Sequence, residues 1–110
     1  MKFKIFQIKD IVNTDYAFRG HYINKFNIED YEIVYDSEVD ENSAETLSDT
    51  EICEYLFVIF NTNMPKDFKG HSLSVSDVIQ LESDGNCRFY YCDTFGWKRL
   101  NINNMHNKNN

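Results

Sequence analysis

The residue types of nucleophilic catalysis gather in the segment Asp67–Asp77. This segment contains His71 followed at once by Ser72, with a carboxylate at each end, and Cys53 is a second candidate nucleophile. A Ser or Cys nucleophile needs a base within hydrogen-bond reach and a third group that orients the base. A small Ser/His or Cys/His hydrolase is therefore one candidate function.

A structural interpretation of the same segment is simpler, and we favour it. No nucleophile elbow or other framework in the sequence would hold a hydroxyl or thiol against His71. Ser, Asp and His side chains in loops commonly bind backbone groups instead. We therefore predict no catalytic residue, and we predict that the apolar Phe68, Leu73 and Val75 are buried. The predicted structural motif consists of Asp67, Gly70, His71, Ser72 and Asp77.

Metal and cofactor sites are not predicted either. Cys87 and Cys92 stand five apart on one predicted strand, so their side chains should point to opposite faces. The chain has no Cys-x-x-Cys or His-x-x-x-His spacing, which zinc sites commonly use. Its four glycines are isolated and form no phosphate-binding loop. We expect no cofactor.

The acidic residues are concentrated in one part of the chain. Between Phe26 and Pro65 there are eleven Asp and Glu residues and no Lys or Arg. Elsewhere the 11 basic residues outnumber the acidic ones, although the total charge is −7. Such a field repels nucleic acid and attracts basic protein surfaces. We expect a protein partner with a basic surface and no direct binding to nucleic acid; the alternative is an acidic loop that serves solubility alone.

Aromatic residues beside these acids are the expected anchors, because interface energy concentrates in buried aromatic side chains. A homodimer stays open as another form of association. The predicted partner-binding residues are Tyr31, Glu32, Tyr35, Asp36, Glu38, Asp40, Glu41 and Tyr55.

One helix is well specified. Ser48 precedes Glu51 by three residues, which is the spacing of a capping box. Pro65 forbids continuation at the other end, so we predict a helix over Ser48–Asn61. The helix is apolar on nearly every side and must be wrapped by a sheet or covered by a partner.

The remaining elements are strands. Apolar and β-branched runs separated by turn residues predict an α+β fold, in which a small antiparallel sheet of about five strands packs on the main helix. We expect a single domain over residues 1–100, an acidic loop over Asp36–Glu45, and a flexible Asn-rich tail over residues 101–110. The predicted strands are Phe3–Ile8, Tyr31–Tyr35, Val75–Leu81, Arg88–Asp93 and Trp97–Ile102.

The compartment follows from the apolar runs and the cysteines. No apolar run approaches the roughly 18 residues of a membrane span, and lysines interrupt the N-terminal apolar residues, unlike a signal peptide. An odd count of 3 cysteines favours reduced thiols. We expect a cytoplasmic protein with no membrane contact.

The stretch Asp67–Val78, extended by Tyr91, Asp93, Phe95 and Gly96, resembles the YodL-like domain family. The resemblance covers roughly Phe3–Leu100 and brings no catalytic residues. It implies a mobile genetic element, because members of the family lie among conjugation, antirestriction and plasmid-maintenance genes. Small stand-alone members look like counter-defence proteins, including anti-CRISPRs. We therefore expect a non-enzymatic inhibitor that blocks a basic nucleic-acid-binding surface of a CRISPR or restriction effector; the alternative is an adaptor in conjugation or plasmid-maintenance complexes.

Overall fold

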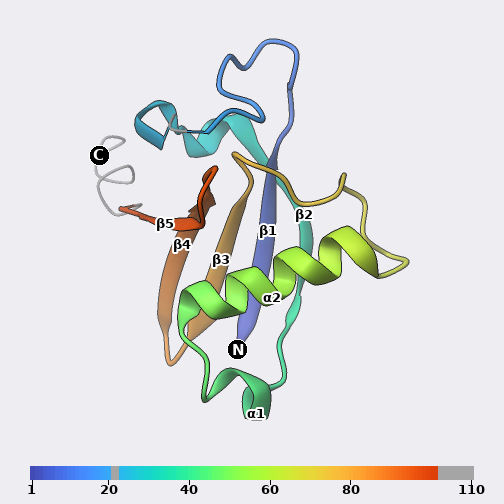
Figure 1. Ribbon diagram of the computed structural model, residues 1–110, viewed down its shortest axis with the longest axis vertical. Coiled ribbons are helices and arrows are strands. Elements are labelled where there is room, and N and C mark those ends of the chain that lie inside the picture. Colours follow the sequence, from blue (N-terminus) through green and yellow to red (C-terminus); the bar gives the residue numbers. More distant parts are fainter. Residues whose placement is uncertain (21–22, 102–110) are drawn as a thin grey trace.

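A five-stranded antiparallel sheet crossed by one main helix forms the protein, which confirms the predicted α+β class (Figure 1). The computed structural model describes residues 1–20 and 23–101. The strands lie in the order β2-β1-β3-β4-β5. Their bounds are β1 Lys2–Ile8, β2 Tyr31–Glu38, β3 Val78–Ser83, β4 Asn86–Cys92 and β5 Trp97–Leu100. The helical elements are the 3-10 turns η1 Ile23–Lys25 and η2 Ile28–Asp30, the short α1 Glu41–Ala44 and the main helix α2 Asp49–Thr62.

The capping box predicted for the main helix is present at the start of α2. The Ser48 backbone N–H donates to the Glu51 carboxylate over 2.9 Å, and the Glu51 N–H donates to the Ser48 hydroxyl over 3.2 Å. Each side chain thereby satisfies a backbone donor that a helix start leaves unpaired. At the other end, Asn63 caps the helix by donating its N–H to the carbonyl of Ile59.

Helix α2 covers only one face of the sheet (Figure 1). Ile52, Leu56 and Phe60 point into the core that α2 forms with the sheet, and all three are buried. Tyr55 and Val58 on the outer side are 50% and 56% exposed. The sequence predicted that α2 is either wrapped by the sheet or covered by a partner. Wrapping by the sheet is wrong, because the outer face of α2 is partly exposed.

The other face of the sheet is covered at one end by the segment between β1 and β2. Its buried aromatic residues are Tyr16 and Phe26, which pack with Tyr31, Val78 and Tyr91. The Tyr16 hydroxyl donates to the Asp30 carboxylate over 2.8 Å, which joins the beginning of this segment to its end. The two faces therefore have separate cores on one sheet.

Three predicted boundaries are wrong. Strand β3 begins at Val78 and not at Val75, because the residues before it form a turn in which the Asp77 N–H donates to the Ser74 carbonyl over 3.0 Å. The acidic loop Asp36–Glu45 is instead the end of β2 followed by α1. Asp40 caps α1 by accepting the Asn42 N–H over 3.1 Å. Strand β5 ends at Leu100, before Asn101, and not at Ile102 as predicted. Ile102 and the rest of the predicted tail beyond Asn101 lie outside the described residues.

Candidate functional site

A groove of about 210 Å³ runs between strand β2 and helix α2. It brings together four of the predicted partner-binding residues, which are Tyr35, Glu38, Asp40 and Tyr55. The other residues along it are mostly apolar, and none of the described residues that line it is Lys or Arg. They are Phe3, Ser37, Val39, Leu56, Ile59, Phe60 and Pro65.

Aromatic rings form the wall of this groove on the side of the core. The Tyr35 ring lies 5.2 Å from that of Phe60 and 6.0 Å from those of Phe3 and Phe68, measured between centroids. Phe60 and Phe68 meet edge to face at 4.9 Å. Rings in these tilted and edge-to-face arrangements attract one another beyond their buried area, which stabilises the groove wall.

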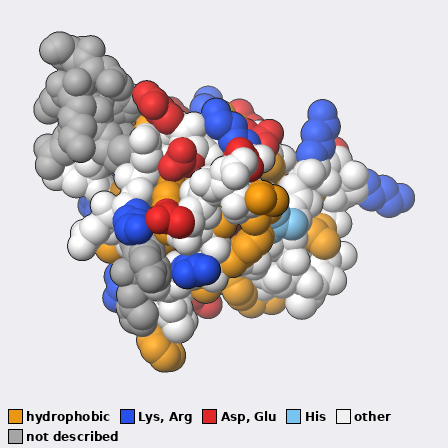
Figure 2. All heavy atoms as spheres, turned by 90° about the horizontal axis from the view of Figure 1, so that it is seen from above, with side chains coloured by type: hydrophobic (Ala, Val, Ile, Leu, Met, Phe, Trp, Pro, Cys, Tyr) orange, Lys and Arg blue, Asp and Glu red, His pale blue; other side chains and the backbone are white. Residues whose placement is uncertain are grey.

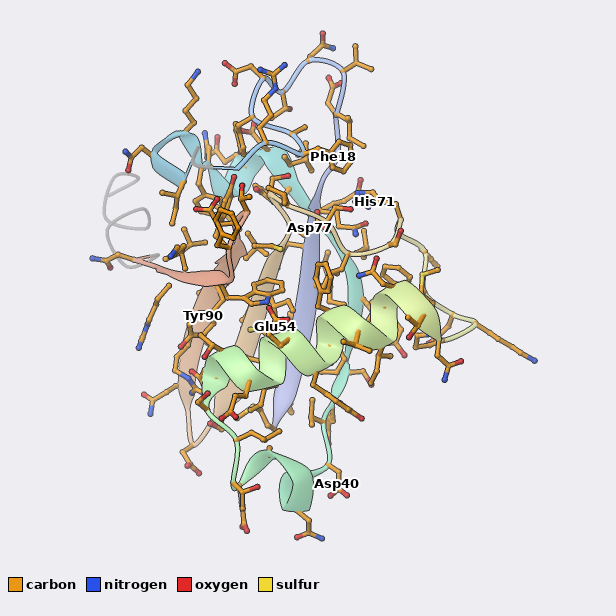
Figure 3. All side chains as sticks on the ribbon, in the orientation of Figure 1. Phe18, Asp40, Glu54, His71, Asp77 and Tyr90 are labelled. Carbon is orange, nitrogen blue, oxygen red and sulfur yellow. The ribbon has the colours of Figure 1, made fainter. Side chains whose placement is uncertain are left out.

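Carboxylates form the rim. Asp40 lies at the α1 end of the groove (Figure 3), and Glu38 stands at the end of β2. A third carboxylate, Asp67, hydrogen-bonds the Tyr35 hydroxyl, and partial burial together with this charge raises the pKa of Tyr35. The groove therefore offers negative charge beside exposed aromatic surface, which suits a cationic side chain with an apolar stem.

The other predicted partner-binding residues lie elsewhere. Tyr31 is only 6% exposed, and its hydroxyl donates to the Ser76 carbonyl, so the prediction that it is a partner anchor is wrong. Its ring packs at the far end of β2, against Phe26 and Tyr16. Glu32 is exposed on β2 away from the groove. Glu41 lies in α1, and its side chain is outside the described residues.

Two of the acids are closer to lysines than the sequence indicated. Asp36 is the cross-strand neighbour of Lys4, and Glu38 that of Lys2. Opposed residues on neighbouring antiparallel strands lie on the same face and within reach of each other. The lysine-free segment is therefore partly neutralised by β1. Its field is weaker than a count along the chain predicts.

The carboxylate of Asp49 is also paired within the fold. The Arg88 guanidinium donates to its carboxylate over 2.6 and 3.1 Å, and the Tyr90 hydroxyl donates over 2.7 Å. Arg88 holds the pKa of Asp49 below its ordinary value. This group joins the first turn of α2 to the middle of β4. Its function is structural.

A second polar cluster, which we call the Gln7 clamp, lies at the other end of the sheet. Gln7 is buried on β1, and its amide nitrogen donates to the His71 carbonyl over 2.8 Å and to the Asp77 carboxylate over 3.0 Å. Its amide oxygen accepts the His71 N–H over 3.1 Å. The Ser74 N–H donates to the same Asp77 oxygen over 2.8 Å. Burial raises the pKa of Asp77 to about 8, although both hydrogen bonds favour its charged form.

Gly70 is required by this clamp. A Cβ added at Gly70 would lie 2.1 Å from the Gln7 amide oxygen and 3.0 Å from the Phe68 ring. Of the apolar residues predicted to be buried in the motif, Leu73 is fully buried. Phe68 and Val75 are only half-buried, because the chain is still turning toward β3 where they occur. Ser72 is exposed and takes part through its carbonyl.

The clamp continues to the segment before β2. Phe18 and Ser76 both have positive φ, +62° and +81°, and the Phe18 N–H donates to the Ser76 hydroxyl over 3.0 Å. The Phe18 ring meets the His71 ring at 5.2 Å. Figure 2 shows a histidine side chain at the surface beside a group of hydrophobic side chains. Left-handed backbone at two non-glycine residues is held here by surrounding contacts.

The chemistry of a hydrolase is poorly served by this geometry. The His71 Nδ1 lies 2.7 Å from the Ser72 carbonyl oxygen and 3.3 Å from the Gln7 amide nitrogen, and none of the hydrogen bonds described for this ring joins it to a Ser hydroxyl or Cys thiol. Cys53 on α2 and Cys92 on β4 are buried in the core between helix and sheet, and burial raises the pKa of both thiols, to about 12 for Cys92. Within residues 1–20 and 23–101, no group of three or more His, Cys, Asp or Glu side chains is arranged to hold a metal ion.

Sequence reasoning missed Gln7 and the pairing of Asp49 with Arg88. A lone glutamine within an apolar strand was the available signal for the first, because a buried amide needs partners. No local signal announces the second, since the partners are 39 residues apart.

Comparison with known proteins gives one family. A family model described as the YodL-like domain matches residues 2–102, which confirms the resemblance drawn from the sequence. No curated protein and no solved structure matches the chain. In the part of the chain that the structure describes, no helix has the length and apolar character of a membrane span.

Proposed function

The chain belongs to the YodL-like domain family, and from this premise we propose that it is a non-catalytic binding protein that receives a basic protein surface in the groove between β2 and α2. The observation that carries the proposal is the lining of that groove. It combines the carboxylates of Glu38 and Asp40 with the half-exposed ring of Tyr55 and contains no described Lys or Arg.

The proposed effect of binding is inhibition. A mobile-element setting, which we expect for this family, favours a target that defends the host cell. The nucleic-acid channel of a CRISPR or restriction effector is basic, so carboxylates can occupy sites that otherwise bind phosphates. The aromatic residues of the groove supply the apolar contact that a specific interface needs. Nucleic acid itself is repelled by the same acids.

Interference assays in living bacteria test this proposal. The protein is expressed in strains that carry an active CRISPR or restriction system, and transformation by a targeted plasmid is counted. We expect at least tenfold more transformants than with an empty vector. The double variant Glu38→Gln/Asp40→Asn should lose this protection, because it removes both groove charges while the new amide at position 40 still caps α1.

A matched variant controls for net charge. Glu29→Gln/Glu45→Gln also removes two exposed carboxylates, but neither residue lines the groove. We expect it to protect as well as the natural sequence does. Equal loss in both variants would show that net charge alone matters, and protection in no strain would reject inhibition. If a partner co-purifies with the protein but the host's defence system still blocks the plasmid, the adaptor function is favoured.

The hydrolase is tested separately through His71. If the protein acts by binding, His71→Ala should leave inhibition intact in the folded fraction, since the side chain lies in the Gln7 clamp and does not line the groove. Loss of a turnover activity at unchanged melting temperature would favour catalysis instead.

A further inference from the structure

Strand β2 is an open edge of the sheet. It is eight residues long and, among the residues that the structure describes, pairs with β1 alone, whereas the strand at the opposite edge, β5, has four residues. An edge strand carries a row of backbone N–H and C=O groups without sheet partners, which can template another strand. Ile33 at its middle is 51% exposed. The groove described above runs along this edge.

An irregularity in β2 sets which side chains flank the edge. The pairing shifts between Ile5 and Phe6 of β1, so that one residue of β2, Val34, has no opposite partner. Such a bulge resets the alternation of side chains. In consequence Ile33 and Asp36, three residues apart, share one face with their β1 neighbours.

The two sides of the edge therefore differ in chemistry. Asp36 lies on the face opposite α2 and lines a second groove of about 340 Å³ with Lys2 and Lys4. Glu38, at the end of β2, borders both this groove and the one beside α2. On the α2 side, Tyr35 lines the aromatic groove. A strand placed against β2 would direct alternate side chains to these two sides.

We propose that the β2 edge takes up an extended segment of the partner protein as a sixth strand, in which cationic residues alternate with apolar ones. This inference rests on the proposed function and specifies its mode. The cationic side chains lie beside Asp36 and Glu38, where opposite charges across a strand pair attract. The apolar side chains enter the groove beside Tyr35 and Tyr55. Backbone hydrogen bonds to β2 supply the rest of the contact.

Charge disfavours a second copy of this chain as the occupant. Strand β2 carries Glu32, Asp36 and Glu38 and no basic residue, so two such edges would bring carboxylates together. Like charges on opposed strands are destabilising, and charges on an edge strand commonly prevent self-association. A cationic strand turns the same carboxylates into attractive contacts.

Nuclear magnetic resonance on the whole isotope-labelled protein tests the inference. The probe is an eight-residue peptide in which arginine alternates with valine. We expect saturable chemical-shift changes centred on β2, and at least tenfold slower hydrogen exchange for the outward β2 amides in the presence of the peptide. A fully N-methylated peptide keeps the charges but has no amide donors, and it should bind at least tenfold more weakly.

Each alternative outcome overturns strand addition. Equal binding of the N-methylated peptide means that side chains alone are recognised, which leaves the proposed function standing. No binding of the arginine–valine peptide, or equal binding of a glutamate–valine peptide, rejects the cationic strand. Concentration-dependent protection of β2 without peptide makes a second copy the occupant. The interference assay measures inhibition separately, so a failure of the proposed function is distinguishable from a failure of strand addition.

Discussion

The Gln7 clamp and the β2–α2 groove lie on the same side of the sheet and use polar groups in opposite ways. In the clamp, one buried amide satisfies three groups on the loop before β3, and its residues have little left to offer a partner. In the groove, the Glu38 and Asp40 carboxylates stand exposed beside a half-exposed tyrosine. Buried polar groups must be paired within the fold, while exposed ones are free to bind.

The clamp and the groove differ in how the sequence encodes them. Residues 67–78 carry the family resemblance, and they build the loop that the clamp holds. The groove comes from an acidic stretch with no motif of its own. The family model spans both regions, over residues 2–102, but its most specific residues build the loop in the clamp, while the proposed binding surface uses residues with no motif of their own. Substitutions in the two regions should differ in what they change, which can be measured.

The largest expected loss of stability follows Gly70→Ala. The added Cβ would collide with the Gln7 amide oxygen at 2.1 Å and force the buried amide from its partners. Overpacking and unsatisfied polar groups together should lower the free energy of unfolding by about 3 kcal/mol. Urea denaturation followed by circular dichroism measures this loss.

A double-mutant cycle shows whether the loss acts through the clamp. In a Gln7→Ala background the collision with the amide is removed and only the 3.0 Å contact with the Phe68 ring remains, so Gly70→Ala should cost about 1 kcal/mol or less. The exposed neighbour Lys69→Ala serves as the control. Additive losses would mean that Gly70 is needed for another reason.

The next largest loss is expected for Asp49→Ala. Its carboxylate has a side-chain exposure of only 23% and holds both Arg88 and Tyr90. Removing one member of a partly buried pair leaves the others without a partner, at a cost of about 2 kcal/mol. Because its folded pKa is lowered, this stabilisation is present above the unfolded pKa of about 3.9 and is lost as the pH falls through the folded value. The control Glu54→Ala, at an exposed position on the same helix, should change the stability little. Equal losses of stability in the two variants would show that the Asp49 contacts are not specifically stabilising.

Asp77 predicts the opposite dependence on pH. Its folded pKa of about 8 lies above the ordinary value, so the folded state holds its proton more tightly than the unfolded state. Stability should therefore fall as the pH rises from about 4 to about 8. Asp77→Asn retains an oxygen for the Ser74 and Gln7 donors and should flatten this slope in thermal melts. An unchanged slope would assign it to other groups.

Local patterns in the sequence predicted much of the fold. The capping box at Ser48 predicted the start of α2, and turn residues between the apolar runs separated the predicted strands, because these signals act over a few residues. The start of β3 was placed three residues early, since the turn before it depends on distant contacts from Gln7 and Phe18. Contacts of that range leave no periodic trace.

The candidate site was predictable only in part. Tyr35 and Tyr55 lie on separate elements, and the structure places both on one groove. Tyr31, on the same strand, is buried at the other end, because β2 passes from one core to the other. The charge of the segment was overestimated because the pairing of β2 with Lys2 and Lys4 is set by the sheet order. Composition alone cannot report cross-strand neighbours.

The smallest effect on stability is expected for Tyr55→Ala, and it tests the groove most directly. The Tyr55 side chain is half exposed on the outer side of α2, and alanine is a good helix former, so the free energy of unfolding should change by about 0.5 kcal/mol or less. Partner binding should weaken at least tenfold, because an aromatic anchor can contribute 2 kcal/mol or more to an interface. Inhibition in the interference assay and binding of the arginine–valine peptide are the readouts. Val12→Ala, at a site 91% exposed and outside the groove, is the control. Undiminished binding by a folded Tyr55→Ala variant would show that the interface does not lie in the groove, and the proposed difference between the groove and the Gln7 clamp would be wrong.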